Sequence, residues 1–156
     1  MTIRPATLSD VESMMALARS STSASQWSRE QYESLVLDHG TSRLALIAES
    51  PNQADALSGF LIAHHVAPEW ELENILVARD FRRNGIGKLL LDSLIAAALE
   101  TDSRAVFLEV RESNAPARGL YERSGFEQSG RRKSYYSNPI EDAILYRRAL
   151  HQPISS

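Results

Sequence analysis

The 156-residue sequence contains no cysteine, which excludes disulfide bonds, thiolate metal ligands and a cysteine nucleophile. An acyl-enzyme on cysteine is therefore impossible, although other covalent routes remain open. The sequence also lacks an excess of basic residues, because 17 Lys and Arg stand against 20 Asp and Glu and give a net charge of −3. Domains that bind nucleic acid are usually clearly basic, so we expect no direct contact with nucleic acid.

Long apolar runs are missing as well. The first ten residues, MTIRPATLSD, lack the apolar segment of a secretory signal peptide, and the apolar stretch after Gly87 is interrupted by Asp92 and Ser93. We therefore expect a cytoplasmic protein with no membrane contact. The length and the 43% apolar content are typical of one globular domain, which we place at residues 1–150, followed by a flexible tail at 151–156.

Capping signals and periodicity predict the first elements. A short strand is expected at Thr2–Arg4, and T-L-S-D from Thr7 resembles a capping box that begins a helix through Ala18. After the Ser-rich linker SSTSAS, Ser28 and Gln31 form a second capping box, and we expect a helix that ends near Leu37.

The rest of the sequence alternates between strand and helix patterns. Strands are expected at Arg43–Glu49, Leu57–Val66, Glu71–Val77, Val106–Val110, Phe126–Tyr136 and Ala143–Leu150, and helices at Ile86–Leu99 and Asn114–Ser124. The first two strands are joined by a turn at residues 51–55, and Gly125 suits the end of the second helix. This order predicts an α/β or α+β fold, with helices on both faces of a sheet and one parallel crossover.

Two glycines, Gly85 and Gly87, lie where the strand at 71–77 gives way to a helix, in the segment RRNGIGK. The segment lacks the spacing and the Lys-Ser/Thr of a P-loop and the third glycine of a dinucleotide motif. Free N–H groups at a helix N-terminus, with Arg82, Arg83 and Lys88 nearby, would suit a phosphate. A surface turn with solvated arginines explains the spacing equally well, so both interpretations stay open.

Several segments together resemble a known family. Arg82-x-x-Gly85-x-Gly87 resembles the Q/R-x-x-G-x-G/A pyrophosphate motif of the GNAT superfamily of acyl-CoA N-acyltransferases, and ELENILV, FLEVRESN and NAPARGLYERSGF follow its order and spacing. LEVRxSN, LYERSGF and YYxxPxEDA resemble the RimI-type ribosomal-protein N-alanine acetyltransferases. The resemblance runs from Thr2 to Leu150. It implies one GNAT domain with a mixed sheet of about seven strands flanked by about four helices.

The resemblance implies that acetyl-CoA is the acetyl donor and that no metal is needed. The backbone of the strand at 75–77 would pair with the pantetheine arm like an added strand, and the glycine turn would hold the pyrophosphate. Asn114 suits a helix N-cap, and the resemblance adds a contact to pantetheine. The expected donor-binding residues are Ile75, Leu76, Val77, Arg82, Arg83, Asn84, Gly85, Ile86, Gly87, Lys88 and Asn114.

Two residues carry the expected chemistry. Glu109 lies near the end of a strand, where it either pairs with Arg111 or solvent or, as in the RimI pattern, acts as the general base directly or through water. An α-amine has a pKa of about 8, so a weak general base is enough to produce the neutral amine that attacks the thioester. Tyr121 lies on a short helix, where a core aromatic is the commoner role. The resemblance makes it the general acid that protonates the thiolate of coenzyme A.

The acceptor side is less defined by the sequence. Trp27-Ser28 matches the W-S of the RimI substrate loop, although Gln26 replaces the usual proline, and Tyr135 and Tyr136 match its paired tyrosines. A sheet-edge aromatic pair is the alternative for the tyrosines. The resemblance points to the N-terminal alanine of a small-subunit ribosomal protein as the acceptor. The alternatives are another protein N-terminus, a small-molecule amine, or a non-catalytic acyl-CoA-binding module.

Three further features are interpreted as structural. The triplet Arg131-Arg132-Lys133 is expected to be a solvated face, although a nucleic-acid contact is conceivable from its aromatic neighbours. His64 and His65 are adjacent on a predicted strand and point to opposite faces, so they do not share a metal. We expect no metal site, and a monomer or a weak dimer.

Overall fold

The computed structural model describes residues 1–21, 26–50, 57–82 and 84–150. Two 3-10 turns, η1 (Leu8–Asp10) and η2 (Arg79–Phe81), lie between the longer elements. In chain order, the helices and strands of this described part are β1 (Thr2–Pro5), α1 (Val11–Arg19), α2 (Arg29–Leu37), β2 (Arg43–Glu49), β3 (Leu57–Val66), β4 (Glu69–Val77), α3 (Ile86–Glu100), β5 (Ala105–Arg111), α4 (Ala115–Arg123), β6 (Glu127–Tyr136) and β7 (Glu141–Ala149).

The strands form one mixed sheet in the order β1-β2-β3-β4-β5-β7-β6. Every neighbouring pair is antiparallel except β4 and β5, which are parallel and are joined by the crossover through α3. The predicted mixed sheet of seven strands with four helices is confirmed.

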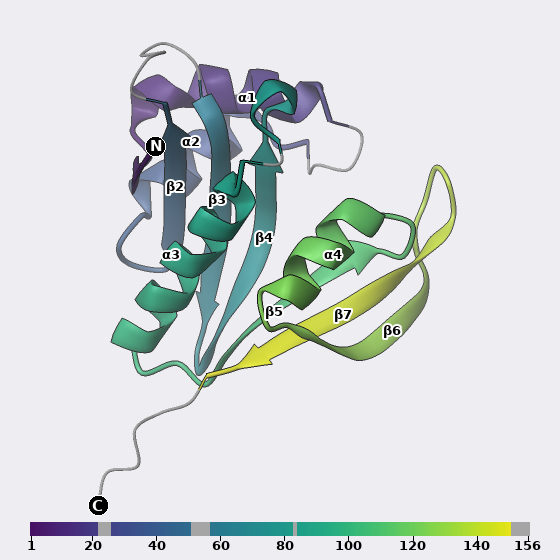
Figure 1. Ribbon diagram of the computed structural model, residues 1–156. Helices are drawn as coiled ribbons and strands as arrows, with labels where there is room; N and C mark the ends of the chain where they lie inside the picture. Colours follow the sequence, from purple (N-terminus) through teal and green to yellow (C-terminus); the bar gives the residue numbers. More distant parts are fainter. Residues whose placement is uncertain (22–25, 51–56, 83, 151–156) are drawn as a thin grey trace, which may run out of the picture.

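The sheet opens between β4 and β5. The two strands pair only at its lower end in Figure 1, where Glu69–Glu71 lies beside Ala105–Phe107. Beyond this point β4 continues to Val77 and β5 to Arg111, and β5 and β7 slant away from the upright β2, β3 and β4 (Figure 1). The parallel pair therefore leaves a wedge in the sheet, bordered by the carboxyl-terminal halves of both strands.

Helices cover both faces of the sheet, as predicted. α3 and α4 lie on one face, where Leu90, Leu94 and Tyr121 join Leu72 and Leu108 in one apolar cluster. α1 and α2 lie on the other face, over a second cluster that contains Met14, Tyr32, Phe60, Ile62 and Leu76. Burial of these side chains from both faces supplies the main apolar stabilisation of the fold.

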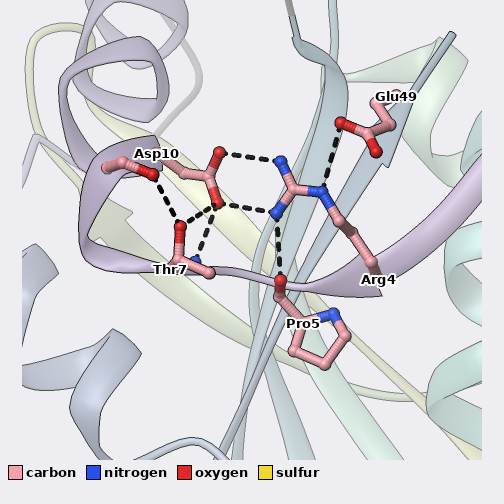
Figure 2. Close-up of polar contacts among 6 residues, drawn as sticks. Arg4, Pro5, Thr7, Asp10 and Glu49 are labelled. Carbon is pink, nitrogen blue, oxygen red and sulfur yellow. Dashed lines mark hydrogen bonds and ion pairs between the residues drawn. The ribbon is translucent and has the colours of Figure 1, made fainter. Parts of the chain in front are cut away.

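The first helix begins differently from the prediction. Thr7 and Asp10 do form a capping box, but Leu8–Asp10 is a 3-10 turn, and the α-helix starts only at Val11. The carboxylate of Asp10 accepts two hydrogen bonds from the Arg4 guanidinium, at 2.8 and 2.9 Å (Figure 2). It accepts a third from the Thr7 backbone N–H at 2.8 Å. These contacts lower the pKa of Asp10, with the Arg4 hydrogen bonds as the main cause.

The other boundaries agree closely with the pattern. The Ser28–Gln31 capping box is present, and α2 ends at Leu37 as expected. β4, β5 and β7 begin one or two residues before their predicted starts. The expected turn at 51–55, most of the Ser-rich linker and the expected tail lie outside the described residues. Among the helices that are described, none is long and apolar enough to cross a membrane.

Candidate active site

A cleft lies where β4 and β5 diverge, and it brings together the residues that the sequence singles out. Its volume is about 90 Å³. Glu109 from β5 and Tyr121 from α4 both line it, although they are twelve residues apart in the sequence. The lining residues are Leu72, Glu73, Asn74, Ile75, Leu76, Glu109, Val110, Arg111, Asn114, Ala117, Tyr121 and Tyr136.

Glu109 projects from the face of β5 that lies opposite α3 and α4. Its neighbours Leu108 and Val110 belong to the apolar cluster under those helices, and alternate residues of a strand point to opposite faces. The carboxylate pairs with Arg132 of β6, whose Nε lies 3.0 Å from Oε1. The alternative pairing with Arg111 is wrong, because Arg111 instead pairs with Glu141 at 3.2 Å.

A second carboxylate, Glu71, lies beside Glu109 and was not predicted. Glu71 is on β4, opposite Phe107 of β5, and it is partly buried. Burial raises the pKa of Glu71, and the negative charge of Glu109 raises it further. The sequence carries a faint signal for this residue, since Glu71 and Glu73 alternate with apolar residues on a strand that is otherwise buried.

Tyr121 is both a core aromatic and a residue of the cleft. Its ring packs at 5.9 Å from Phe126 and 6.1 Å from Tyr146, measured between ring centroids, and only 6% of the residue is exposed. Burial raises the pKa of Tyr121 well above its usual value, with a smaller contribution from Tyr136. The hydroxyl therefore stays protonated at neutral pH, which is the state that a proton donor needs.

Asn114 confirms its predicted structural role. It caps α4, and its Oδ1 accepts a hydrogen bond from the Ala117 backbone N–H at 3.3 Å. Asn114 also lines the cleft, together with Ile75 and Leu76 of β4. Val77, at the end of β4, packs against the cluster under α3. Contacts of these residues with pantetheine remain predictions.

Glycine suits positions 85 and 87 of the turn for two different structural reasons. Gly85 is the N-cap of α3 and has a φ of +77°, a conformation that glycine adopts readily. Gly87 lies against α4: a Cβ placed there would come within 2.9 Å of Leu120 Cδ2. The missing side chain at position 87 thus lets α3 and α4 approach closely, whether or not a phosphate binds.

Two of the polar residues around the turn already make contacts within the protein. Arg82 Nε donates to the Val77 carbonyl at 3.2 Å, and Lys88 pairs with Asp92 at 2.9 Å. Asn84 is exposed and Ile86 is buried, while Arg83 lies outside the described residues. Both cations are on the surface, so a bound anion would compete only with water and with weak surface contacts.

The acceptor-side residues fall into two groups. Trp27 packs edge-on against Tyr32, with ring centroids 5.5 Å apart, and joins the cluster under α1 and α2. Tyr135 and Tyr136 contact each other at 5.1 Å, but only Tyr136 lines the cleft. The negative charge of Glu109 is the main cause that raises the pKa of Tyr135. The structure therefore brings Tyr136 to Glu109 and Tyr121, whereas Trp27 is partly buried against the cluster under α1 and α2.

Gln26, which stands where the RimI pattern has proline, ties the start of this loop to α1. Its Nε2 donates to the Ala18 carbonyl at 2.9 Å. This contact holds the chain just before Trp27.

Two residues of the basic triplet and one of the two histidines make contacts within the protein. Arg131 pairs with Glu112 and Asp142, and Arg132 pairs with Glu109, so neither offers an unpaired positive charge. His65 stacks on Trp70 at 4.8 Å. A search of the described residues finds no group of three His, Cys, Asp or Glu that suits a metal ion.

A larger groove, of about 620 Å³, lies away from the cleft. It lies between the end of α3, at Ile95 and Leu99, and the strands β6 and β7. Its lining includes none of the catalytic or ligand-binding residues predicted from the sequence, so we place the site in the smaller cleft.

Comparison with known proteins identifies the family of the chain. Residues 11–126 match the acetyltransferase (GNAT) family. Over 96 residues the chain is 43% identical to the ribosomal protein bS18-alanine N-acetyltransferase of Salmonella typhimurium, which covers 58% of this chain and 63% of that protein. The aligned part is thus a little under two thirds of that relative's length.

Solved structures extend the similarity to almost the whole chain. The ribosomal-protein-S18-alanine N-acetyltransferase from Escherichia coli superposes with a TM-score of 0.82 at 29% identity, over 97% of this chain and 95% of that chain. Ard1 from Thermoplasma volcanium gives a TM-score of 0.83 at 25% identity, over 97% and 98%. The family match covers well over half of the sequence and the fold agrees with it, so this chain belongs to the GNAT acetyltransferase family.

Proposed function

We propose that the protein transfers an acetyl group from acetyl-CoA to a protein N-terminal amine, with the N-terminal alanine of a small-subunit ribosomal protein as the acceptor. The observation that carries the proposal is the meeting of Glu109 and Tyr121 in one cleft, from two different elements. The relatives named for bS18-alanine acetylation support the choice of acceptor. Such an acceptor places the reaction in the cytoplasm.

The donor fits the wedge between β4 and β5. Past Glu71, the side of β4 that faces β5 has no strand partner within the described residues, so the amides of pantetheine would pair with the backbone of residues 75–77. The pyrophosphate would lie on the N-terminus of α3, where the first N–H groups have no partner within the helix. Arg82, Lys88 and Asn114 would contact the donor at the turn and along its arm.

The chemical step needs one base and one acid. Glu109 takes a proton from the acceptor ammonium, directly or through water, and the free amine attacks the thioester carbonyl. A C–N bond forms and the C–S bond breaks as the proton on the Tyr121 hydroxyl passes to the leaving thiolate. The nitrogen of the adduct gives up its second proton through water to the Tyr121 phenolate, which restores the hydroxyl, and Glu109 releases the first proton to solvent. Because both reactants are held in one cleft, much of the rate would come from positioning.

The acceptor would approach from the face of the sheet that carries Glu109. Tyr136 borders the cleft on this side, and Tyr135 adds an exposed ring beside it. Trp27 would shape the opposite side of the entrance through the loop that it anchors. Arg132 would give up part of its contact with Glu109 when the acceptor ammonium arrives.

The test is release of thiol from acetyl-CoA, measured with and without a peptide that begins with the alanine of a ribosomal protein. We expect release that depends on the peptide, and mass spectrometry of the peptide should show one added acetyl group at the α-amine. Release that appears only with other N-termini or with small amines would favour those acceptors. No release above background with any amine would overturn the enzymatic function.

A further inference from the structure

One buried polar group in the cleft has no partner. Asn74 of β4 is 7% exposed and lines the cleft, and its Nδ2 is shielded from solvent without a hydrogen-bond partner among the described residues. A buried donor left unpaired costs about 1–3 kcal/mol. Native proteins retain few such groups, and each one calls for an explanation.

The register of β4 fixes the face on which Asn74 lies. Asn74 is opposite Ile62 of β3, whereas Leu72 is opposite Ala63, so Glu73 is an extra residue in a β-bulge. Leu72 and Ala63 belong to the cluster under α3, and Ile62 belongs to the cluster under α1 and α2. Residues directly opposite each other in an antiparallel pair share a face, so Asn74 lies on the face opposite α3.

Glu109 lies on that same face, since its neighbours Leu108 and Val110 are buried under α3 and α4. Asn74 and Glu109 therefore border the cleft from its two strands, both on the side from which the amine would approach. Tyr121 belongs to the opposite layer, on α4. The unpaired donor is thus placed toward the acceptor and away from the leaving thiol.

We propose that the side-chain amide of Asn74 donates a hydrogen bond to the first peptide carbonyl of the acceptor, and so selects peptide α-amines over amines without that carbonyl. This inference rests on the proposed function. In an α-amino peptide, the carbonyl lies only two atoms from the amine, so Glu109 and Asn74 would contact neighbouring groups of one residue. A site built to hydrogen-bond a substrate group discriminates strongly against analogues that lack it.

The test compares two acceptors and two proteins. One acceptor is the alanine-starting peptide, and the other is the same peptide with its first amide replaced by a trans-alkene, which keeps the shape and removes the carbonyl. In the wild-type protein we expect kcat/KM to favour the amide peptide by about tenfold to 100-fold, the range of one hydrogen bond in a buried site. In Asn74→Leu the preference should fall to about twofold or less, with KM for acetyl-CoA unchanged.

Two further variants keep the result interpretable. Asn74→Asp replaces the amide by a group of similar shape that has no N–H, and it should lose the same preference if Asn74→Leu fails to fold. Ser124→Ala is the matched control, because Ser124 Oγ is also buried without a partner in the described structure but does not line the cleft. Ser124→Ala should retain the wild-type preference.

The outcomes separate this inference from the proposed function. A wild-type protein that acetylates neither peptide overturns the proposed function and the role of Asn74 together. An active wild-type protein without a preference for the amide peptide overturns only the role of Asn74. The same follows if the folded Asn74 variants keep the preference, or if they lose activity equally on both acceptors.

Discussion

Arg132 Nε of β6 lies 3.0 Å from Oε1 of Glu109 on β5. β7 lies between β5 and β6, so this ion pair spans the width of the middle strand. The carboxylate that we propose as the base is thus already held by a cation before any amine arrives. An acceptor ammonium would replace one positive neighbour of Glu109 by another, which keeps the carboxylate oriented toward the cleft.

Replacing Glu109 by Gln should lower turnover by about 100-fold or more, the usual contribution of a general base. The shape of the side chain is kept, so binding of acetyl-CoA should not change. The rise of turnover with pH should become steeper, because the amine must then lose its proton to solvent and turnover follows the fraction of free amine. Steady-state rates between pH 6 and 9 and a titration with acetyl-CoA check both points. Turnover and a pH response equal to the wild type would remove Glu109 from the mechanism.

Replacing Tyr121 by Phe should lower turnover by about tenfold, less than a strong general acid contributes, because a thiolate is a good leaving group. The ring contacts with Phe126 and Tyr146 are kept, so the melting temperature should stay close to that of the wild type. Since burial raises the pKa of Tyr121, the wild-type enzyme should show no loss of activity from ionisation of this group below about pH 10. Unchanged turnover in the folded variant would argue against an acid at this position.

Replacing Gly85 by Ala should weaken binding of acetyl-CoA and lower stability. The φ of +77° costs a residue with a Cβ about 1 kcal/mol. In the free protein a Cβ at position 85 would meet no atom within 4 Å, so any further loss of affinity would come from crowding of the bound pyrophosphate. Calorimetric titration and thermal melting measure the two effects separately.

Gly40 provides the control for that substitution. It has a φ of +90° and open space around its Cβ position, but it lies outside the cleft and the glycine turn. Gly40→Ala should lose similar stability with unchanged affinity for acetyl-CoA. Equal affinity in the Gly85 and Gly40 variants would refute a close approach of the donor at Gly85.

Replacing Asp10 by Asn should destabilise the fold by about 2 kcal/mol at pH 7, because charged hydrogen bonds from Arg4 are lost. The folded pKa of Asp10 lies below its unfolded value of about 3.9, so its contribution is complete above that pH and is lost as pH falls through the lower folded value. Chemical denaturation at pH 7 and near pH 3 should therefore show a smaller difference between variant and wild type at the acid pH. A difference that is constant with pH would contradict the role of the ionised carboxylate.

Local patterns predicted most of the fold. The Ser28 capping box, the apolar runs of β2 and β3 and the Gly125 helix end each depend on residues close in sequence, so their signals are readable without the structure. Glu109, Tyr121 and Asn114 were found through family motifs in the same way, and the structure gathers all three around one cleft.

Features that depend on register between strands were not predictable. The pairing of Glu109 with Arg132, and not with Arg111, follows from the order β5-β7-β6, which no local pattern encodes. The bulge at Glu73 is likewise invisible, and without it Asn74 would be assigned to the face of Leu72. The close approach of Leu120 to Gly87 was not predictable either, because the two residues lie on different helices and are more than thirty positions apart in the sequence.

The short pairing between β4 and β5 also bears on aggregation. Beyond Glu71, a row of backbone donors and acceptors on β4 has no strand beside it in the described part of the chain. Such rows at the outer edge of a sheet invite other chains to add themselves. Here the row lies in the interior of the sheet, where β5, β6 and β7 continue beyond the gap and restrict access for a full strand. A thin ligand would therefore fit this open edge more easily than a second polypeptide.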